Sequence, residues 1–470
     1  MVTELKPYPE YKDAGVQWLG CLPERWKVRR LRGVAQMLVS NIDKHSTPGE
    51  VPVRLCNYVD VYKNERITDR LPFMQATASR DEADAFRLET GDVVITKDSE
   101  EWDDIAVPAL VEYAASDLVC GYHLAILRPH NEVVSGPYLA RALQAPCIAH
   151  QFYVAANGVT RYGLSHDAIK SALVTVPPQS EQAAIVRYLD HADRKVRHAI
   201  HARQQLIKLL TEQKQAIIQR AVTRGLDPNV RLKPSGVSWL GDIPEHWQVT
   251  RLARVVRSSN AGEVIDKGWW GRGKEVLYTC ARDPFQSDYP NFPARKRTTG
   301  IDLLVTRNGT PYVHRPVADA LYSNVVQRIN LVPGSNRQYV ALSLEEAARS
   351  MKGYGVSIES LNYDMWKQLV LVVSPPVEQA AIVQYVDATT VTLDKAIYAA
   401  RREIDLLREY RTRLIADVVT GKLDVRNVPV SADETDAMPE ELESIDDVDA
   451  IDQTDDVAEG DSESSSEESA

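Results

Sequence analysis

The sequence is poor in features that would point to a particular class of protein. It has five cysteines and five phenylalanines in 470 residues. The cysteines, at positions 21, 56, 120, 147 and 280, include no Cys-x-x-Cys pair and no Cys/His cluster. Neither a disulfide framework nor a zinc site is therefore predicted, and a reducing compartment suits the chain.

Long apolar segments are also missing. No run approaches the ~20 residues that a membrane-spanning helix needs. The opening residues, MVTELKPYPEYKDAG, contain no apolar signal region. We therefore expect a cytoplasmic protein without a membrane association.

Catalytic motifs are absent as well. There is no phosphate-binding G-x-x-x-x-G-K-[ST] loop, no Gly-x-Ser-x-Gly elbow and no metal-spaced histidine pair. The segment Gly271-Arg-Gly273 is too short for a dinucleotide fingerprint and is predicted to be a flexible basic loop. Ser374-Pro375-Pro376-Val377 lacks the aromatic residue of an amino-methyltransferase signature, and we interpret it as the start of a helix. The chain is predicted to be a binder without catalytic residues, metal or cofactor.

Positive charge is missing from the C-terminal segment. From Pro429 to Ala470 there are 17 acidic residues and no Lys or Arg. The remaining body has 55 basic and 49 acidic residues, a net of +6, although the whole chain carries −11. Residues 425–470 are predicted to be an acidic, disordered tail that solubilises the protein or competes for a basic groove. The basic body permits nucleic-acid binding.

Two stretches of the chain repeat the pattern of a long helix. Residues 178–225 and 375–424 share eight of ten residues between Glu181–Asp190 and the segment 197 positions later. Their apolar residues follow a period of seven, which favours a coiled coil in which the two helices pair. The predicted pairing residues are Leu189, Val196, Ile200, Ile207, Leu210, Ile217, Val386, Leu393, Ile397, Ile404, Leu407 and Leu414.

A second motif is repeated ahead of each helix. The first Trp motif, Gly15–Leu31, shares eleven of seventeen positions with the second, Gly236–Leu252. Between motif and helix, GDVVITKD resembles IDLLVTRNG, and both predict a short strand followed by a polar turn. The segment from Gly158 to Pro178 aligns without gaps on that from Gly355 to Pro375, and each closes with a strand.

The predicted fold is therefore α+β, with two globular α/β domains alternating with two long antiparallel coiled-coil helices in a pseudo-twofold internal repeat. The expected domains are residues 1–177, the first helix at 178–225, residues 226–374, the second helix at 375–424, and the tail at 425–470.

Basic and aromatic side chains interleave in both globular regions, as in proteins that contact phosphates and base edges. Each residue taken alone also fits a solvated cation or an aromatic at the edge of the core. The candidate DNA-binding residues are Lys44, Tyr58, Lys63, Lys97, Ser99, Arg161 and Tyr162 in the first region, and Trp270, Arg272, Lys274, Arg282, Arg295, Lys296, Arg297, Arg307, Asn308, Thr310 and Arg315 in the second.

The duplicated Trp-Leu-Gly-x-x-Pro-x-x-Trp, Pro-Pro-x-x-Glu-Gln-x-x-Ile and Val-Thr-x-Gly/Val-Thr-Gly-Lys landmarks resemble those of the specificity subunit of type I restriction–modification systems. The resemblance implies two target recognition domains that each read one half of a bipartite, asymmetric site in double-stranded DNA. It implies that the helices space these domains and dock two modification subunits. Those subunits bind S-adenosylmethionine and methylate adenine, and separate restriction subunits carry the motor and nuclease. The subunit itself is non-catalytic.

Two other interpretations of the sequence remain open. A coiled-coil interaction scaffold without a DNA role would explain the helices but not the duplicated Trp-framed basic domains. A stand-alone DNA methyltransferase or nuclease with divergent motifs would explain the basic domains, but it would need signatures that the sequence lacks.

Overall fold

The computed structural model describes residues 5–237, 239–351 and 360–429. Within these ranges the chain forms two compact units: the first comprises residues 5–203 and 402–429, and the second comprises residues 204–401. Each long helix contributes one part to each unit. The predicted acidic tail beyond residue 429 and the turn expected at Gly355 lie outside the described residues.

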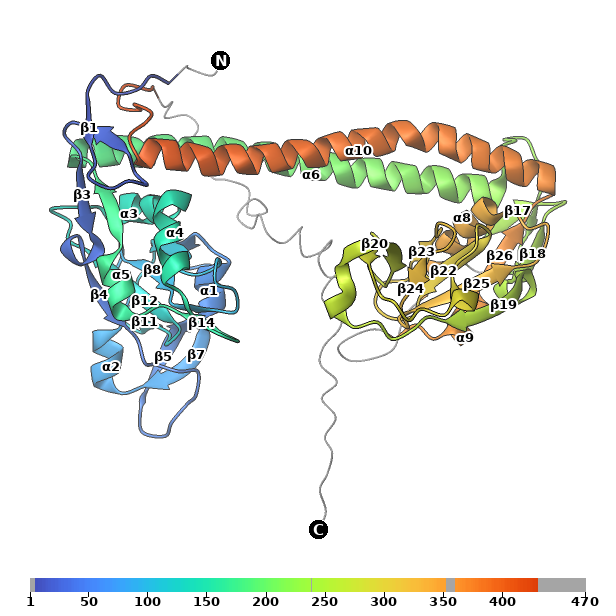
Figure 1. The fold of residues 1–470 in the computed structure, drawn as a ribbon, viewed down its shortest axis with the longest axis horizontal. Helices are drawn as coiled ribbons and strands as arrows, with labels where there is room; N and C mark the ends of the chain where they lie inside the picture. Colours follow the sequence, from blue (N-terminus) through green and yellow to red (C-terminus); the bar gives the residue numbers. More distant parts are fainter. Residues whose placement is uncertain (1–4, 238, 352–359, 430–470) are drawn as a thin grey trace, which may run out of the picture. The chain divides into compact units, whose positions relative to one another are not determined.

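The two long helices are α6, Gln179–Arg224, and α10, Pro376–Val419 (Figure 1). Arg203 pairs with Glu403, and Lys214 Nζ lies 2.5 Å from Asp394 Oδ1. Partner numbers fall along α10 as they rise along α6, so the helices are antiparallel, which confirms the predicted pair. Glycine follows each helix, as Gly225 and Gly421, in the left-handed backbone region that glycine adopts readily.

All twelve residues of the predicted seam are buried or half-buried. Six of the twelve are buried and six are half-buried. A two-stranded coil buries less of each side chain than a globular core does. The buried residues are Leu189, Val196, Ile200, Val386, Ile404 and Leu414.

The first unit contains a five-stranded sheet of order β4-β12-β8-β10-β6 and a three-stranded sheet of order β11-β5-β7. Strand β15 pairs with β3 to close the unit beside α6. Its elements are β1 Tyr11–Asp13, β2 Cys21–Pro23, β3 Lys27–Arg30, β4 Ala35–Val39, β5 Val51–Cys56, α1 Tyr58–Tyr62, β6 Arg66–Ile67, β7 Met74–Ala78, α2 Arg80–Ala85, β8 Val93–Thr96, β9 Asp98–Ser99, β10 Pro108–Val111, β11 Leu118–Cys120, β12 Leu124–Pro129, α3 Gly136–Leu143, α4 Pro146–Ala155, β13 Asn157–Gly158, β14 Tyr162–Gly163, α5 His166–Ser171 and β15 Leu173–Val176.

The second unit repeats most of this topology, without a counterpart of β6 among the described strands, although the intervening sequences differ. Its four-stranded sheet has the order β19-β25-β22-β23, its three-stranded sheet the order β21-β20-β24, and β18 pairs with β26. Its elements are β16 Leu232–Pro234, β17 Asp242–Pro244, β18 Gln248–Arg251, α7 Leu252–Val255, β19 Val256–Ala261, β20 Trp270–Tyr278, β21 Phe285–Ser287, β22 Asp302–Thr306, β23 Val313–His314, β24 Leu321–Tyr322, β25 Val326–Leu331, α8 Arg337–Ala348, α9 Tyr363–Gln368 and β26 Val370–Val373.

One local prediction is wrong. The segment Gly271-Arg-Gly273, expected as a flexible loop, lies within strand β20. Both glycines have positive φ, 75° and 88°, and the pairing of β20 with β21 shifts register between Trp270 and Glu275. Left-handed glycines of this kind accommodate a bulge, so the strand continues through them.

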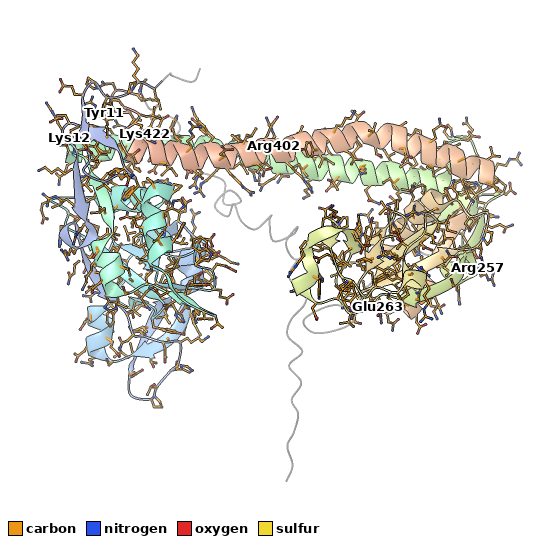
Figure 2. All side chains as sticks on the ribbon, in the orientation of Figure 1. Tyr11, Lys12, Arg257, Glu263, Arg402 and Lys422 are labelled. Atoms are coloured by element: carbon orange, nitrogen blue, oxygen red, sulfur yellow. The ribbon has the colours of Figure 1, made fainter. Side chains whose placement is uncertain are left out.

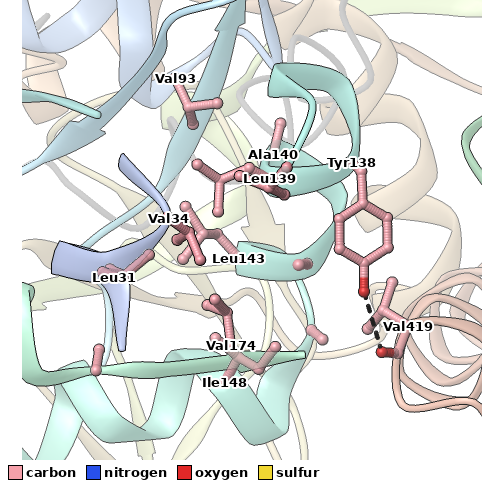
Figure 3. Close-up of a cluster of buried hydrophobic side chains, with 14 of the residues drawn as sticks. Leu31, Val34, Val93, Tyr138, Leu139, Ala140, Leu143, Ile148, Val174 and Val419 are labelled. Carbon is pink, nitrogen blue, oxygen red and sulfur yellow. Dashed lines mark hydrogen bonds between the residues drawn. The ribbon is translucent and has the colours of Figure 1, made fainter. Parts of the chain in front are cut away.

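The core of the first unit extends onto the C-terminal part of α10. Tyr138 on α3 is fully buried, and its hydroxyl lies 3.5 Å from the Val419 carbonyl (Figure 3). The same hydroxyl lies 2.9 Å from Thr175 Oγ1, and Thr175 donates to the Val419 carbonyl at 2.7 Å. The globular part and the helix end therefore share one packed and hydrogen-bonded interior.

Candidate nucleic-acid interface

Lys97 and Arg307 occupy the same place in the two units. Each directly follows the corresponding central strand, β8 or β22. The carbonyl of Lys97 accepts from the Leu164 amide at 3.0 Å, and that of Arg307 accepts from the Leu361 amide at 2.7 Å. Leu164 and Leu361 are 197 positions apart, the offset of the aligned segments. The backbone thus presents one cationic side chain at the equivalent turn of each unit.

In the first unit this turn supports a row of polar groups. Lys97 Nζ lies 3.0 and 2.9 Å from the two carboxylate oxygens of Asp98, and His123 Nδ1 lies 2.9 Å from Asp98 Oδ2. Arg161 Nη2 lies 3.3 Å from His123 Nε2. Asp98 balances the charge of Lys97. The guanidinium of Arg161, at the other end of the row, is exposed to solvent and has no carboxylate partner in the row.

Two tyrosines stand beside the row. Tyr58 and Tyr62 stack on helix α1 with ring centroids 5.4 Å apart and an interplanar angle of 14°. The short helix is held by reciprocal capping between Asn57 and Asp60. Burial raises the pKa of Tyr58, against the effect of a hydrogen bond with Ser99, so its hydroxyl stays a neutral donor and acceptor. Flat rings of this kind can stack on bases or pack along a sugar-phosphate chain.

The equivalent turn in the second unit is built differently. Arg307 Nη1 donates to the Asn324 carbonyl at 3.0 Å, and no ion pair of Arg307 occurs among the described residues. Its buried Nε atom has no hydrogen-bond partner there. Asn308 forms a backbone bridge with Ser360, as Asp98 does with Gly163. The second turn therefore carries a net positive charge where the first is balanced by Asp98.

Three of the predicted DNA-binding residues in the second unit already have carboxylate partners in that unit. Their charges are used to hold the domain together, so they contribute less free charge to its surface. The pairs are Lys296 with Glu263 at 2.5 Å, Arg297 with Glu275 at 2.7 Å, and Arg315 with Glu345 at 2.7 and 3.0 Å.

The other predicted residues divide into surface and packing positions. Tyr162 is half-buried in β14 and Ser99 is buried in β9. The Trp270 ring packs on Phe285 at 5.1 Å between centroids, and its Nε1 atom donates to the Ile265 carbonyl. The exposed residues are Lys44, Lys63, Arg272, Lys274, Arg282, Arg295 and Thr310. The Arg272 guanidinium lies over Trp269, 5.9 Å from the ring centroid.

A charged network that the sequence did not reveal joins the first domain to the helix pair. Glu65 and Asp193 both pair with Arg411 of α10, and Arg197 Nη2 lies 2.7 Å from Glu65 Oε2. Burial would raise the pKa of Asp193, but Arg411, Arg197 and Arg141 outweigh it and lower the pKa. Arg411 and Arg197 lower the pKa of Glu65 in the same way. These ion pairs hold the globular part of the first unit against α6 and α10.

The described residues contain no group of three or more His, Cys, Asp or Glu side chains placed to hold a metal ion. No helix among them combines the length and the apolar character that crossing a bilayer requires.

The sequence and the fold were compared with those of known proteins. Residues 23–209 match the family described as "Type I restriction modification DNA specificity domain". No curated protein matches the sequence. A solved structure described as "Structural basis underlying complex assembly and conformational transition of the type I R-M system" has a TM-score of 0.59 at 14% identity, covering 86% of this chain and 99% of that one.

Two further solved structures are similar over comparable lengths. The HsdS subunit from Thermoanaerobacter tengcongensis has a TM-score of 0.41 at 16% identity, covering 86% of this chain and 98% of that chain. The S subunit of a type I restriction-modification system from M. genitalium has a TM-score of 0.34 at 13% identity, covering 84% and 96%.

The first of these structures supports the fold, and the family match identifies the domain that begins within the first Trp motif and extends into α6. The landmarks of that domain occur again in the second unit. Residues 23–209 therefore form a type I restriction modification DNA specificity domain, and the chain shares the fold of the first of these solved structures.

Proposed function

We propose that the two units read the two halves of one bipartite, asymmetric site in double-stranded DNA. The observation that carries this proposal is the equivalence of Lys97 and Arg307, which hold the same backbone position in different side-chain surroundings. A shared position supports a shared task, and different neighbours support different target bases.

The first unit offers the exposed Arg161 guanidinium, which suits the O6 and N7 acceptors of guanine or a phosphate. The stacked Tyr58 and Tyr62 rings lie in the same unit and suit contacts with sugars and bases. The second unit offers Arg307 with free donor capacity and Asn308, whose amide suits adenine. The exposed Lys274 and Arg295 suit phosphates, which position a protein on DNA without reading its sequence.

We infer in addition that the helix pair spaces the two domains and docks partner subunits. Helices α6 and α10 expose large apolar side chains along the pair, including Leu209 at 61% and Tyr398 at 72%. Apolar side chains of this size favour a protein partner over solvent. The partners would be two modification subunits that methylate adenine in each half-site, joined by restriction subunits that carry the motor and nuclease, all in the cytoplasm.

Methylation by the chain assembled with its modification subunits tests this function. In the first variant residues 27–170 are exchanged for the corresponding region of another family member; in the second, Arg307 is replaced by Ala. The exchange should change the methylated sequence in one half-site only, and Arg307→Ala should weaken selection in the other half, by ~1–3 kcal/mol of base discrimination if Arg307 contacts a base.

Arg254→Ala, an exposed arginine outside the turns, is the matched control and should leave both halves unchanged. An unchanged methylation pattern in the exchange variant would refute the assignment of residues 27–170. Methyl transfer or cleavage by the chain alone would instead establish an enzyme, and an assembled complex without sequence-selective binding would favour a scaffold.

A further inference from the structure

Five basic side chains lie on and next to strand β3, at an edge of the first unit. All five are exposed, and none forms an ion pair or a side-chain hydrogen bond with a described residue. Strand β3 pairs only with β15 among the described strands, so its other edge is open. The nearest carboxylate in sequence is the exposed Glu24. The basic edge, as we call this set, consists of Arg25, Lys27, Arg29, Arg30 and Arg32.

The repeat shows that the fold does not require this charge. The second unit builds the same ribbon from β18 and β26 with largely neutral residues. Among the aligned positions, only Arg251 is also a lysine or arginine. His246, which aligns with Arg25, is bonded to Glu378 at 2.7 Å. In order, the aligned residues are His246, Gln248, Thr250, Arg251 and Ala253. The positive charge in the first unit therefore calls for a ligand rather than a structural explanation.

The basic edge is also separate from the candidate interface of its own unit. In Figure 1, β3 lies on one side of the first unit, and α1 and β14 lie on the opposite side. A duplex held at Arg161 and Tyr58 would not reach β3 on the same face. The proposed recognition surface therefore does not account for this charge.

The chain leaves α10 against the first Trp motif, which continues into β3, and an oppositely charged segment follows in the sequence. After α10 the chain packs on the N-terminal segment: the Tyr11 hydroxyl donates to the Gly421 carbonyl at 3.0 Å, and the Asp424 amide donates to the Lys6 carbonyl at 2.8 Å. Figure 2 shows Lys422 at the same corner as Tyr11 and Lys12. A Cβ atom on Gly421 would lie only 2.4 Å from Pro23, within the first Trp motif that continues into β3.

The remaining 41 residues, 430–470, carry 17 acidic side chains and no Lys or Arg. A chain of that length has a root-mean-square span on the order of 35 Å if it behaves as a flexible coil. A ligand tethered so close to its site acts at an effective concentration in the millimolar range. Charge, reach and point of attachment therefore all favour a ligand that belongs to the same chain.

We propose that the acidic C-terminal segment, residues 430–470, docks on the basic edge of β3 in the same chain and suppresses non-specific binding of nucleic acid there. A free row of five cations would bind any phosphate backbone without regard to sequence. Such binding competes with target search because genomic DNA offers a vast excess of non-target sites. The tethered carboxylates compete for the cations, so that DNA is held by the recognition surfaces alone.

The first test follows the tail in the full-length protein with a glutamate-specific protease. The variant K27Q/R29T/R32A gives the basic edge the residues that the second unit has at these positions, so the ribbon remains compatible with its side chains. At 50 mM salt the tail of this variant should be cleaved several times faster than that of the parent protein, and the difference should vanish at high salt. The matched control, R251Q/R254Q in the second unit, should be cleaved like the parent. Equal cleavage of all three proteins would overturn the proposal.

The second test measures binding of a non-target duplex. A full-length variant with every carboxylate of residues 430–470 replaced by its amide should bind about tenfold or more tightly at low salt, because the tethered competitor is gone. The same replacement in the K27Q/R29T/R32A background should have no effect. An equal gain in both backgrounds would mean that the tail acts elsewhere. Weaker DNA binding by K27Q/R29T/R32A without faster tail cleavage would mean that β3 is a DNA contact. Either result would overturn the proposal, and neither depends on which sequences the two units recognise.

Discussion

Trp26 Nε1 donates a hydrogen bond of 2.9 Å to Glu181 Oε2, and Trp247 forms the same bond with Glu378 at 2.8 Å. Each bond ties a Trp motif to the first turn of a long helix. The same two rings also cover a helix end: Gly421 lies against Trp26, and Gly225 lies against Trp247. In each unit one Trp motif is therefore the place where one long helix starts and the other stops.

The first prediction concerns Glu181. It is buried and accepts from both Trp26 and the Tyr8 hydroxyl, so Glu181→Ala leaves two buried donors without a partner. Each unsatisfied donor costs ~1–3 kcal/mol. We expect a lower melting temperature for the transition of the first unit, measured by calorimetry. Glu24→Ala, an exposed carboxylate in the same motif, should leave that transition unchanged. An unaltered melting curve for Glu181→Ala would contradict the structural role of the bond.

The second prediction separates backbone strain from steric contact at three glycines. Gly236, Gly225 and Gly421 all have φ near +75°. A Cβ atom at Gly236 meets nothing within 4 Å, one at Gly225 lies 3.1 Å from Trp247, and one at Gly421 lies 2.4 Å from Pro23. Alanine at Gly236 should cost ~1–2 kcal/mol for the left-handed conformation alone.

Alanine at Gly225 should lower the free energy of unfolding slightly more than alanine at Gly236 does. Alanine at Gly421 should lower it most, because Pro23 must move. The order of the three variants in chemical denaturation checks this. Equal losses would mean that the helix end does not press on the Trp motif.

The third prediction concerns the network around Arg411. Arg411→Met removes a positive charge that pairs with both Glu65 and Asp193, so the repulsion between these two carboxylates is offset less. The free energy of unfolding should fall by an amount between the ~0–1 kcal/mol of surface ion pairs and the ~3–5 kcal/mol of buried ones, because these side chains are only partly exposed. The stability of the first unit in urea measures it. The equivalent exposed ion pair, tested by Lys214→Met, should cost under about 1 kcal/mol.

The same network predicts a pH dependence. The pKa values of Asp193 and Glu65 are lowered in the folded protein, so their contribution is complete above the ordinary carboxyl pKa of about 4. It is lost as the pH falls below that value toward the lowered pKa values. The melting temperature of the first unit should therefore drop between about pH 5 and pH 3, and that of the Arg411→Met variant should drop less steeply. Parallel curves for the two proteins would contradict this assignment.

Much of the fold could be predicted from the sequence because its signals are local or repeated. The period of seven in α6 and α10 and the duplicated Trp motifs lie in contiguous residues. The similar topology of the two units was less visible, because β5 and β20 pair alike without sharing a sequence pattern. Backbone hydrogen bonds define the pairing, and many residue types suit a partly buried strand, so different sequences satisfy one topology.

The candidate interface was harder to predict than the fold. The match between Lys97 and Arg307 followed from aligned strands, but the partner of each cation depends on residues far away in sequence. Arg297 meets Glu275 across 22 positions, and Arg411 meets Glu65 across 346. No periodicity encodes such pairs. The cations from Arg25 to Arg32 are visible in the sequence, but most of them lie in the first Trp motif, whose repetition its tryptophans already explain.

The last prediction tests the proposed spacing role of the helices. One heptad is inserted into each: a copy of residues 197–203 after Arg203, and a copy of residues 403–409 before Glu403, which is the partner of Arg203. Seven residues keep the period of the seam and lengthen each helix by ~10 Å, close to the rise of three base pairs. The methylated sequence should keep both half-sites while the gap between them grows by about three base pairs.

Insertion into α6 alone is the matched control. It displaces the seam of one helix against the other, and this variant should lose pairing and methylation together. Sequencing of methylated adenines in cells that carry each variant with its modification partner gives the result. A double insertion that left the gap unchanged, or that altered the bases within either half-site, would contradict the proposed role. An altered gap with intact half-sites would separate spacing by the helices from base reading by the domains, because the insertion lies more than thirty residues from either turn in sequence.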